Sequence, residues 1–72
     1  MEIQRGDKII GVFGAMIAEW AGEITKVEDT NQGVMVDVMW DNGSVTYVTG
    51  GDIRQDYFNP TGSPIGYYAN PF

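Results

Sequence analysis

The chain has 72 residues, of which 43% are apolar, and its ten acidic and four basic side chains give a formal net charge of −6. A chain this short makes one domain at most and buries only about 60% of its unfolded surface on folding. Cysteine and histidine are absent, which excludes disulfides and zinc sites with nitrogen or sulfur ligands, and no apolar run approaches the ~20 residues of a membrane helix.

The charge pattern also bears on partners and location. Each basic side chain has an acid within three positions along the chain. Nucleic-acid binding draws its affinity from clustered lysine and arginine, so the pattern disfavours DNA or RNA and fits a basic partner or simple solubility. Residues 1–8 mix acids and bases, unlike a secretory signal peptide. We therefore expect a cytoplasmic protein with no membrane partner.

Apolar runs between turn residues indicate the first two strands. Residues 7–13 follow Gly6 and predict the first strand. Residues 13–21, which include Met16 and Trp20, are expected to form a long loop with at most one helical turn, because glycines flank them. Residues 21–28 predict the second strand, and residues 29–33 the turn that follows it.

Residues 34–49 carry the strongest pattern. Residues 34–40 have valine or tryptophan at every even position, the period of a half-buried strand. Asn42-Gly43 then predicts a two-residue type I′ turn and a β-hairpin. In that register the pairs are Trp40 with Val45, Val38 with Tyr47, and Val36 with Thr49. These bulky side chains are assigned to the core, because a slip of one residue would turn them to solvent.

The predicted opposite face of this hairpin is a candidate interface. It carries Met35, Met39 and Val48, an apolar group that would suit a partner or a second copy of the chain. The Asn42-Gly43 register leaves six residues on this face: Met35, Asp37, Met39, Ser44, Thr46 and Val48.

The C-terminal part differs in composition. Residues 52–54 are expected to form a short 3₁₀ turn with Ile53 pointing inward. Residues 57–72 hold all three prolines yet are more aromatic than a flexible linker. We therefore divide the chain into a barrel, residues 1–56, and a tail, residues 57–72. The tail is expected to wrap the barrel, add a strand, or pack on a neighbouring subunit through Tyr67 and Tyr68.

Catalysis and metal binding are not expected. Without histidine or cysteine, the remaining nucleophiles are hydroxyl groups, and a barrel this small has little concavity in which to shift the pKa of a carboxylate. The aspartates lack the alternating spacing and distal glutamate of a calcium loop. We predict no enzyme activity, no metal and no cofactor.

Four segments together resemble the SH3-like small barrels, and among them the Tudor, KOW and Mind-bomb-type modules. They are Gly6-Asp7-Lys8-Ile9, Glu19-Trp20-Ala21-Gly22-Glu23-Ile24, Val36-Asp37-Val38-Met39-Trp40-Asp41-Asn42-Gly43, and residues 48–53. The resemblance covers residues 6–54 and implies an all-β barrel of about five strands that binds a ligand on loops and strand ends.

Within this group, Tudor-type readers hold methylated lysine or arginine in an aromatic cage, where the cation lies over ring faces. The matching positions are Trp20, Trp40 and Tyr47, with Asp41 or Asp52 as the anionic wall. For Trp20, a loop anchor and a binding surface both stay open, whereas Trp40 and Tyr47 fit the core better.

Two hypotheses follow for function. The first is a non-catalytic, self-associating structural or protein-interaction module, favoured because small domains without disulfides or metals need tight packing or oligomerisation. The alternative is a stand-alone peptide-binding module that uses Trp20 and the neighbouring loops.

Overall fold

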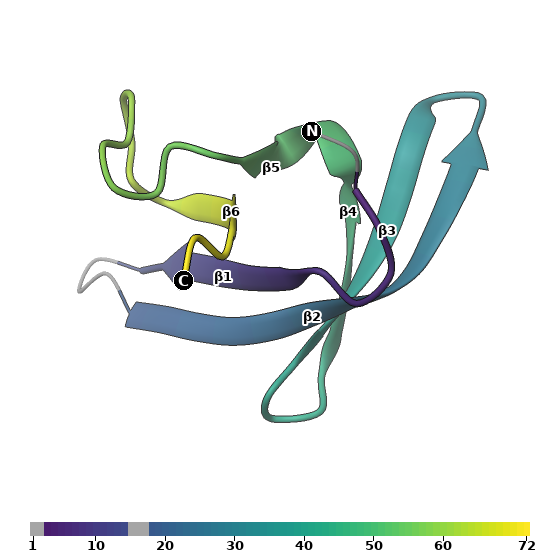
Figure 1. Ribbon diagram of the computed structural model, residues 1–72, viewed down its shortest axis with the longest axis horizontal. Helices are drawn as coiled ribbons and strands as arrows, with labels where there is room; N and C mark the ends of the chain where they lie inside the picture. The colour runs from purple at the N-terminus through teal and green to yellow at the C-terminus, as the bar shows by residue number, and fades with distance from the viewer. Residues whose placement is uncertain (1–2, 15–17) are drawn as a thin grey trace.

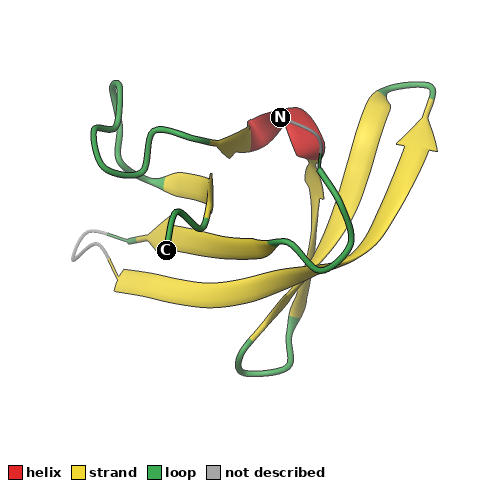
Figure 2. Ribbon diagram, viewed as in Figure 1, coloured by secondary structure: helices red, strands yellow, loops and turns green. Residues whose placement is uncertain are grey.

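The computed structural model describes residues 3–14 and 18–72, and these form an all-β domain (Figures 1 and 2). Six strands lie in one sheet in the order β4-β3-β2-β1-β6-β5, with every neighbouring pair antiparallel except β5 and β6. The elements are β1 (Lys8–Phe13), β2 (Ala18–Thr30), β3 (Gly33–Trp40), β4 (Val45–Thr49), the 3₁₀ turn η1 (Gly50–Asp52), β5 (Ile53–Arg54) and β6 (Gly66–Ala69).

The edge strands β4 and β5 do not pair with each other within residues 3–14 and 18–72, so the sheet is not closed into a barrel there. The expectation of an all-β chain is confirmed. The count of about five strands is one short, because β6 adds a strand from the tail.

The long strand β2 connects the two halves of the sheet. Its first half pairs with β1 and its second half with β3, and the register shifts between Ile24 and Lys26. Such a bulge bends a strand and increases its twist. In Figure 1 the outer part of β2 and β3 accordingly extends away from β1 and β6 as a projecting hairpin.

The main core lies between these two halves. Its most buried side chains are Ile9, Ile24, Val36 and Val38, each at most 1% exposed, and Trp40 is 4% exposed. Ile53 is buried beside them, which confirms its predicted inward orientation. The full set of buried residues in this cluster is Ile9, Ile24, Val36, Val38, Trp40, Val48 and Ile53.

A second apolar cluster covers the opposite face of β1. Successive side chains of a strand point to opposite faces, and Ile10 and Val12 pack there with Tyr68 of β6. Tyr68 lies opposite Ile10 and is only 1% exposed. Strand β1 is thus buried on both sides, and residues 66–69 form an inner strand between β1 and β5. The domain boundary at residue 56 stays a prediction.

Arg54 organises the chain between β5 and β6. Its guanidinium donates to both carboxylate oxygens of Asp56, at 3.0 and 2.8 Å, and to the carbonyl oxygens of Thr61 and Ser63. It also lies 4.9 Å from the ring centroid of Tyr68, within cation–π range. The Arg54 side chain therefore holds in place the loop that connects β5 to β6.

The predicted hairpin register is wrong by one residue. Val36 pairs with Val48, Val38 with Thr46, and Met39 with Val45. The N–H of Gly43 donates to the carbonyl of Trp40 at 2.8 Å, and Gly43 has a φ of +87°. The loop is therefore a three-residue one, in which a turn at residues 41–42 is followed by a left-handed glycine, rather than a type I′ turn on residues 42–43.

In the observed register, the side chains of β4 lie on the opposite faces from those predicted. Val48 is buried in the core, 7% exposed, whereas Val45 and Tyr47 are 53% and 56% exposed. The assignment of Val48 to an outer interface and of Tyr47, Val45 and Thr49 to the core is thus wrong. Trp40, Val38 and Val36 lie in the core as predicted.

Two further boundaries differ from prediction. Strand β2 begins at Ala18, so Trp20 lies on a strand, opposite Gly11, and not in a loop. The 3₁₀ turn spans Gly50–Asp52 instead of residues 52–54. The helical turn considered near Met16 falls on residues 15–17, outside the described part of the chain. No helix within the described ranges is long and apolar enough to cross a membrane.

Candidate functional site

Strand β4 forms one open edge of the sheet, since it pairs with β3 alone. The N–H of Trp40 donates to the carbonyl of Ser44 at 2.8 Å. Hydrogen-bonded and non-bonded pairs alternate along an antiparallel ladder, so Thr46 and Val48 turn their backbone groups toward β3. Val45, Tyr47 and Thr49 turn theirs outward, away from β3, although the carbonyl of Thr49, the N-cap of η1, accepts the first bond of that turn.

This edge also has an apolar outer face. Val45 and Tyr47 are more than half exposed, and Met39, which lies opposite Val45, is 44% exposed. Monomeric proteins usually block an open edge with lysine, proline or a bulge. The β4 sequence, Val-Thr-Tyr-Val-Thr, has none of these. We call the outward backbone of β4 with Met39, Val45 and Tyr47 the β4 edge surface.

The residues predicted to form one interface do not lie on one surface of the structure. Met39 lies on the β4 edge surface, and Met35 is half-buried on the same side of β3, opposite Thr49. Val48 and Tyr68 are buried, and Tyr67 is partly buried against the main core. Sequence reasoning missed Val45 as a surface residue because the turn was misjudged.

A cluster of four aromatic rings lies at the other side of the core. Trp40 is stacked on Tyr67 with ring centroids 6.1 Å apart, and Phe13 meets Trp20, Trp40 and Tyr67 edge to face at 5.5–6.2 Å. Trp20 meets Trp40 edge to face at 6.4 Å. Only Trp20 is substantially exposed in this cluster, at 42%.

Two glycines make room for this packing. An ideal Cβ on Gly22 would lie 2.7 Å from Cε3 of Trp40, and one on Gly11 would lie 2.7 Å from Cη2 of Trp40. Both distances are too short for a real carbon contact, so the indole of Trp40 lies directly on the backbone of β1 and β2.

The exposed edge of Trp20 borders a shallow notch of about 320 Å³. Asp41 and Asn42 of the hairpin turn line the notch, and the N–H of Asp41 donates to the carbonyl of Ala21 at 3.0 Å. Glu19 completes the lining. We call this the Trp20 notch.

The predicted aromatic cage is only partly assembled. Trp20, Trp40 and Asp41 come together, but the Trp40 ring is buried. Tyr47 lies on the β4 edge surface, and Asp52 lies exposed on η1. A cage that uses the faces of Trp40 and Tyr47 does not form.

Glu19 also connects the notch to the tail. The hydroxyl of Tyr57 donates to its carboxylate, and this hydrogen bond, together with burial of the phenol, raises the pKa of Tyr57. Tyr57 in turn meets Tyr68, Phe58 and Phe72 edge to face. Phe58 and Phe72 are 69% and 83% exposed, so the tail presents an aromatic surface of its own.

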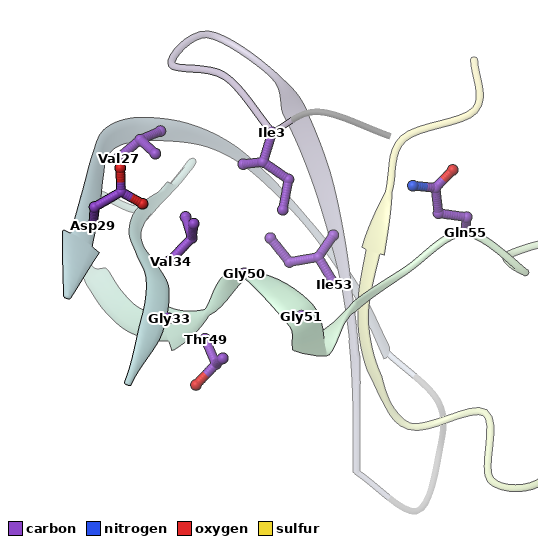
Figure 3. Close-up of a pocket in the computed structure, with 10 residues that line it drawn as sticks. All are labelled: Ile3, Val27, Asp29, Gly33, Val34, Thr49, Gly50, Gly51, Ile53 and Gln55. Carbon is purple, nitrogen blue, oxygen red and sulfur yellow. The ribbon is translucent and has the colours of Figure 1, made fainter. Parts of the chain in front are cut away.

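A second concave surface, of about 700 Å³, lies where the projecting β2–β3 hairpin faces η1 (Figure 3). Valine and isoleucine side chains and three glycines line it, with Asp29 on the hairpin side. We call this the end groove. In the described ranges no group of three or more histidine, cysteine, aspartate or glutamate residues is arranged to hold a metal ion.

Comparison of the chain with protein-family models, with curated proteins and with solved structures found no match in any of the three.

Proposed function

We propose that this chain is a non-catalytic interaction module that self-associates by pairing β4 with β4 of a second copy, and that its sheet is of the SH3-like type. The observation that supports this proposal is the open β4 edge. The SH3-like assignment is supported by the order and spacing of the four sequence segments.

The geometry of β4 suits a two-fold antiparallel pairing. Tyr47 is the central residue of the strand, so a symmetry axis beside it would place Tyr47 opposite Tyr47 of the partner, and Val45 opposite Thr49 of the partner. Because the outward residues alternate along the strand and the carbonyl of Thr49 already begins η1, such a pair would form about four backbone hydrogen bonds. A C2 contact of this kind closes on itself and does not propagate.

The exposed side chains add apolar burial to this backbone pairing. Two copies of Tyr47 would lie side by side on one continuous face, with Met39 and Val45 around them. Cross-strand aromatic and β-branched pairs stabilise a sheet by roughly 0.2–1 kcal/mol each. Opposing this, two chains of net charge −6 repel each other, so we expect association to strengthen as salt screens the repulsion.

Sedimentation equilibrium over a concentration series tests this proposal. We expect the wild type to approach the mass of two chains, and Tyr47→Lys to stay monomeric with an unchanged circular dichroism spectrum, because a lysine on the edge blocks pairing. Ile65→Lys is the matched control, since Ile65 is 48% exposed in the tail, and it should associate like the wild type. A monomeric wild type, or a Tyr47→Lys variant that still dimerises equally, would contradict the proposal.

A second candidate function is supported by the Trp20 notch. An exposed indole beside the carboxylates of Asp41 and Glu19 can attract a cationic side chain, since a cation within about 6 Å of a tryptophan ring centroid is stabilised. We therefore propose, as the alternative, a peptide-binding module for lysine or methyl-lysine side chains. Titration with acetyl-trimethyllysine-amide should change the indole N–H resonance of Trp20. An unchanged resonance at saturating probe would rule this alternative out.

A further inference from the structure

The end groove has an apolar floor that the fold leaves uncovered. Val27 and Val34 are 39% and 37% exposed although both lie on the inner side of the hairpin, continuous with the buried Val36. Ile3 and Ile53 face them across the groove, as Figure 3 shows. Gly33, Gly50 and Gly51 contribute no side chains to fill the space.

One carboxylate stands beside this floor. Asp29 lies directly opposite Val34 in the β2–β3 ladder, so both side chains are on the inner face of the hairpin. Asp29 is exposed, and Figure 3 shows its carboxyl group next to Val27. A side chain lying on the valines can therefore reach this carboxylate without leaving the apolar surface.

The charge around the groove is negative. Asp29 is the one ionisable residue among the described residues that line it. The two bases directly next to lining residues in sequence form ion pairs of their own, Lys26 with Glu28 at 3.5 Å and Arg54 with Asp56. None of the described residues that line the groove is a base that would complement Asp29.

We propose that the end groove binds an arginine side chain of a partner protein, flanked by aliphatic residues. The methylene groups of arginine would pack on Val27, Val34 and Ile53, and its guanidinium would donate two parallel hydrogen bonds to Asp29. Arginine fits better than lysine because its planar fork matches a carboxylate and is weakly hydrated, while its stem covers apolar surface. This goes beyond the proposed function, since it concerns another surface and a different partner.

The test is an NMR titration of the ¹⁵N-labelled full chain with acetyl-Leu-Arg-Leu-amide. We expect saturable shifts at the amides of Val34, Gly50 and Gly51. The same peptide with citrulline, which has nearly the same shape without the charge, should bind about tenfold more weakly, the loss expected for one charge-assisted hydrogen-bonded pair.

Two matched variants locate the interaction. Asp29→Asn should weaken binding of the arginine peptide about tenfold and leave the citrulline peptide unaffected. Asp37→Asn makes the same charge change on the outer face, opposite Tyr47, and should bind like the wild type. Tyr47→Lys, which tests self-association, should also leave this titration unchanged, so the two proposals fail separately.

Four results would overturn the proposal: no saturable shifts, equal binding of the citrulline peptide, equal weakening by Asp37→Asn, or shifts confined to β4. A lysine peptide that binds as tightly as the arginine peptide would overturn the assignment to arginine.

Discussion

Substituting Gly22 by alanine is expected to destabilise the domain through the packing of Trp40. The new Cβ would lie 2.7 Å from Cε3 of Trp40, 2.9 Å from Cγ1 of Val38 and 3.0 Å from Cζ3 of Trp40. Trp40 and Val38 are 4% and 0% exposed, so neither can move into solvent to relieve the contact. Gly22 has no positive φ, and the cost is therefore steric rather than conformational.

The loss of stability expected for Gly22→Ala follows from two opposing effects. Overpacking a well-filled core costs about 1–3 kcal/mol, and alanine in place of glycine returns roughly 0.4–1 kcal/mol by restricting the unfolded chain. The net loss is about 1.5 kcal/mol in a domain whose total stability is on the order of 5 kcal/mol. For a chain of this size, that lowers Tm by roughly 6–12 °C.

Thermal unfolding followed by near-ultraviolet circular dichroism is the appropriate assay, because it reports on the tryptophan environment. Gly51→Ala is the matched control: its Cβ would have no neighbour within 4 Å and its φ is not positive, so its Tm should equal or slightly exceed that of the wild type. If Gly22→Ala and Gly51→Ala melt together, the close approach of Trp40 to β2 is refuted.

Two other predictions concern the tail. The hydrogen bond from Arg54 and the N–H of Thr61 lower the pKa of Asp56, so its carboxylate stabilises the fold above the ordinary aspartate range and this contribution is lost as the pH falls through the lowered pKa. Melting of the wild type and Asp56→Asn from neutral to strongly acidic pH should therefore show a Tm difference that disappears on acidification, and parallel curves would argue against the Arg54–Asp56 contact. Truncation after residue 56 removes β6 and uncovers Ile10 and Val12, 7% and 4% exposed in the full chain; we expect loss of cooperative melting, and an unchanged Tm would mean that the tail does not support the sheet.

Sequence patterns predicted the elements better than the contacts between them. The alternation of Val36, Val38 and Trp40 correctly identified the core side of β3, because period-2 burial is a local property. The residues of the β3–β4 turn are compatible with two different turn types. Asn42-Gly43 satisfies a two-residue turn, but Asp41-Asn42 followed by a left-handed Gly43 satisfies a three-residue one. The choice moves every β4 side chain to the other face.

The surfaces were harder to predict than the strands. Burial of Ile10 and Val12 depends on β6, whose Tyr68 and Gly66 pair with them from far along the chain. No local pattern encodes such a pairing. The register shift between Ile24 and Lys26, which the sequence did not indicate, directly precedes Val27 and Asp29, the β2 residues that line the end groove. Trp20 and Asp41 line one notch, but Trp20 lies on β2 and not in a loop, and their role in binding stays a prediction.

Amide hydrogen exchange along β4 at low and high protein concentration tests self-association most directly. The amides of Thr46 and Val48 point toward β3 and should be protected at both concentrations. Those of Val45, Tyr47 and Thr49 point to the open edge, so they should exchange fast at low concentration and become protected as the chains pair. Fast exchange of all three at high concentration would contradict pairing through β4.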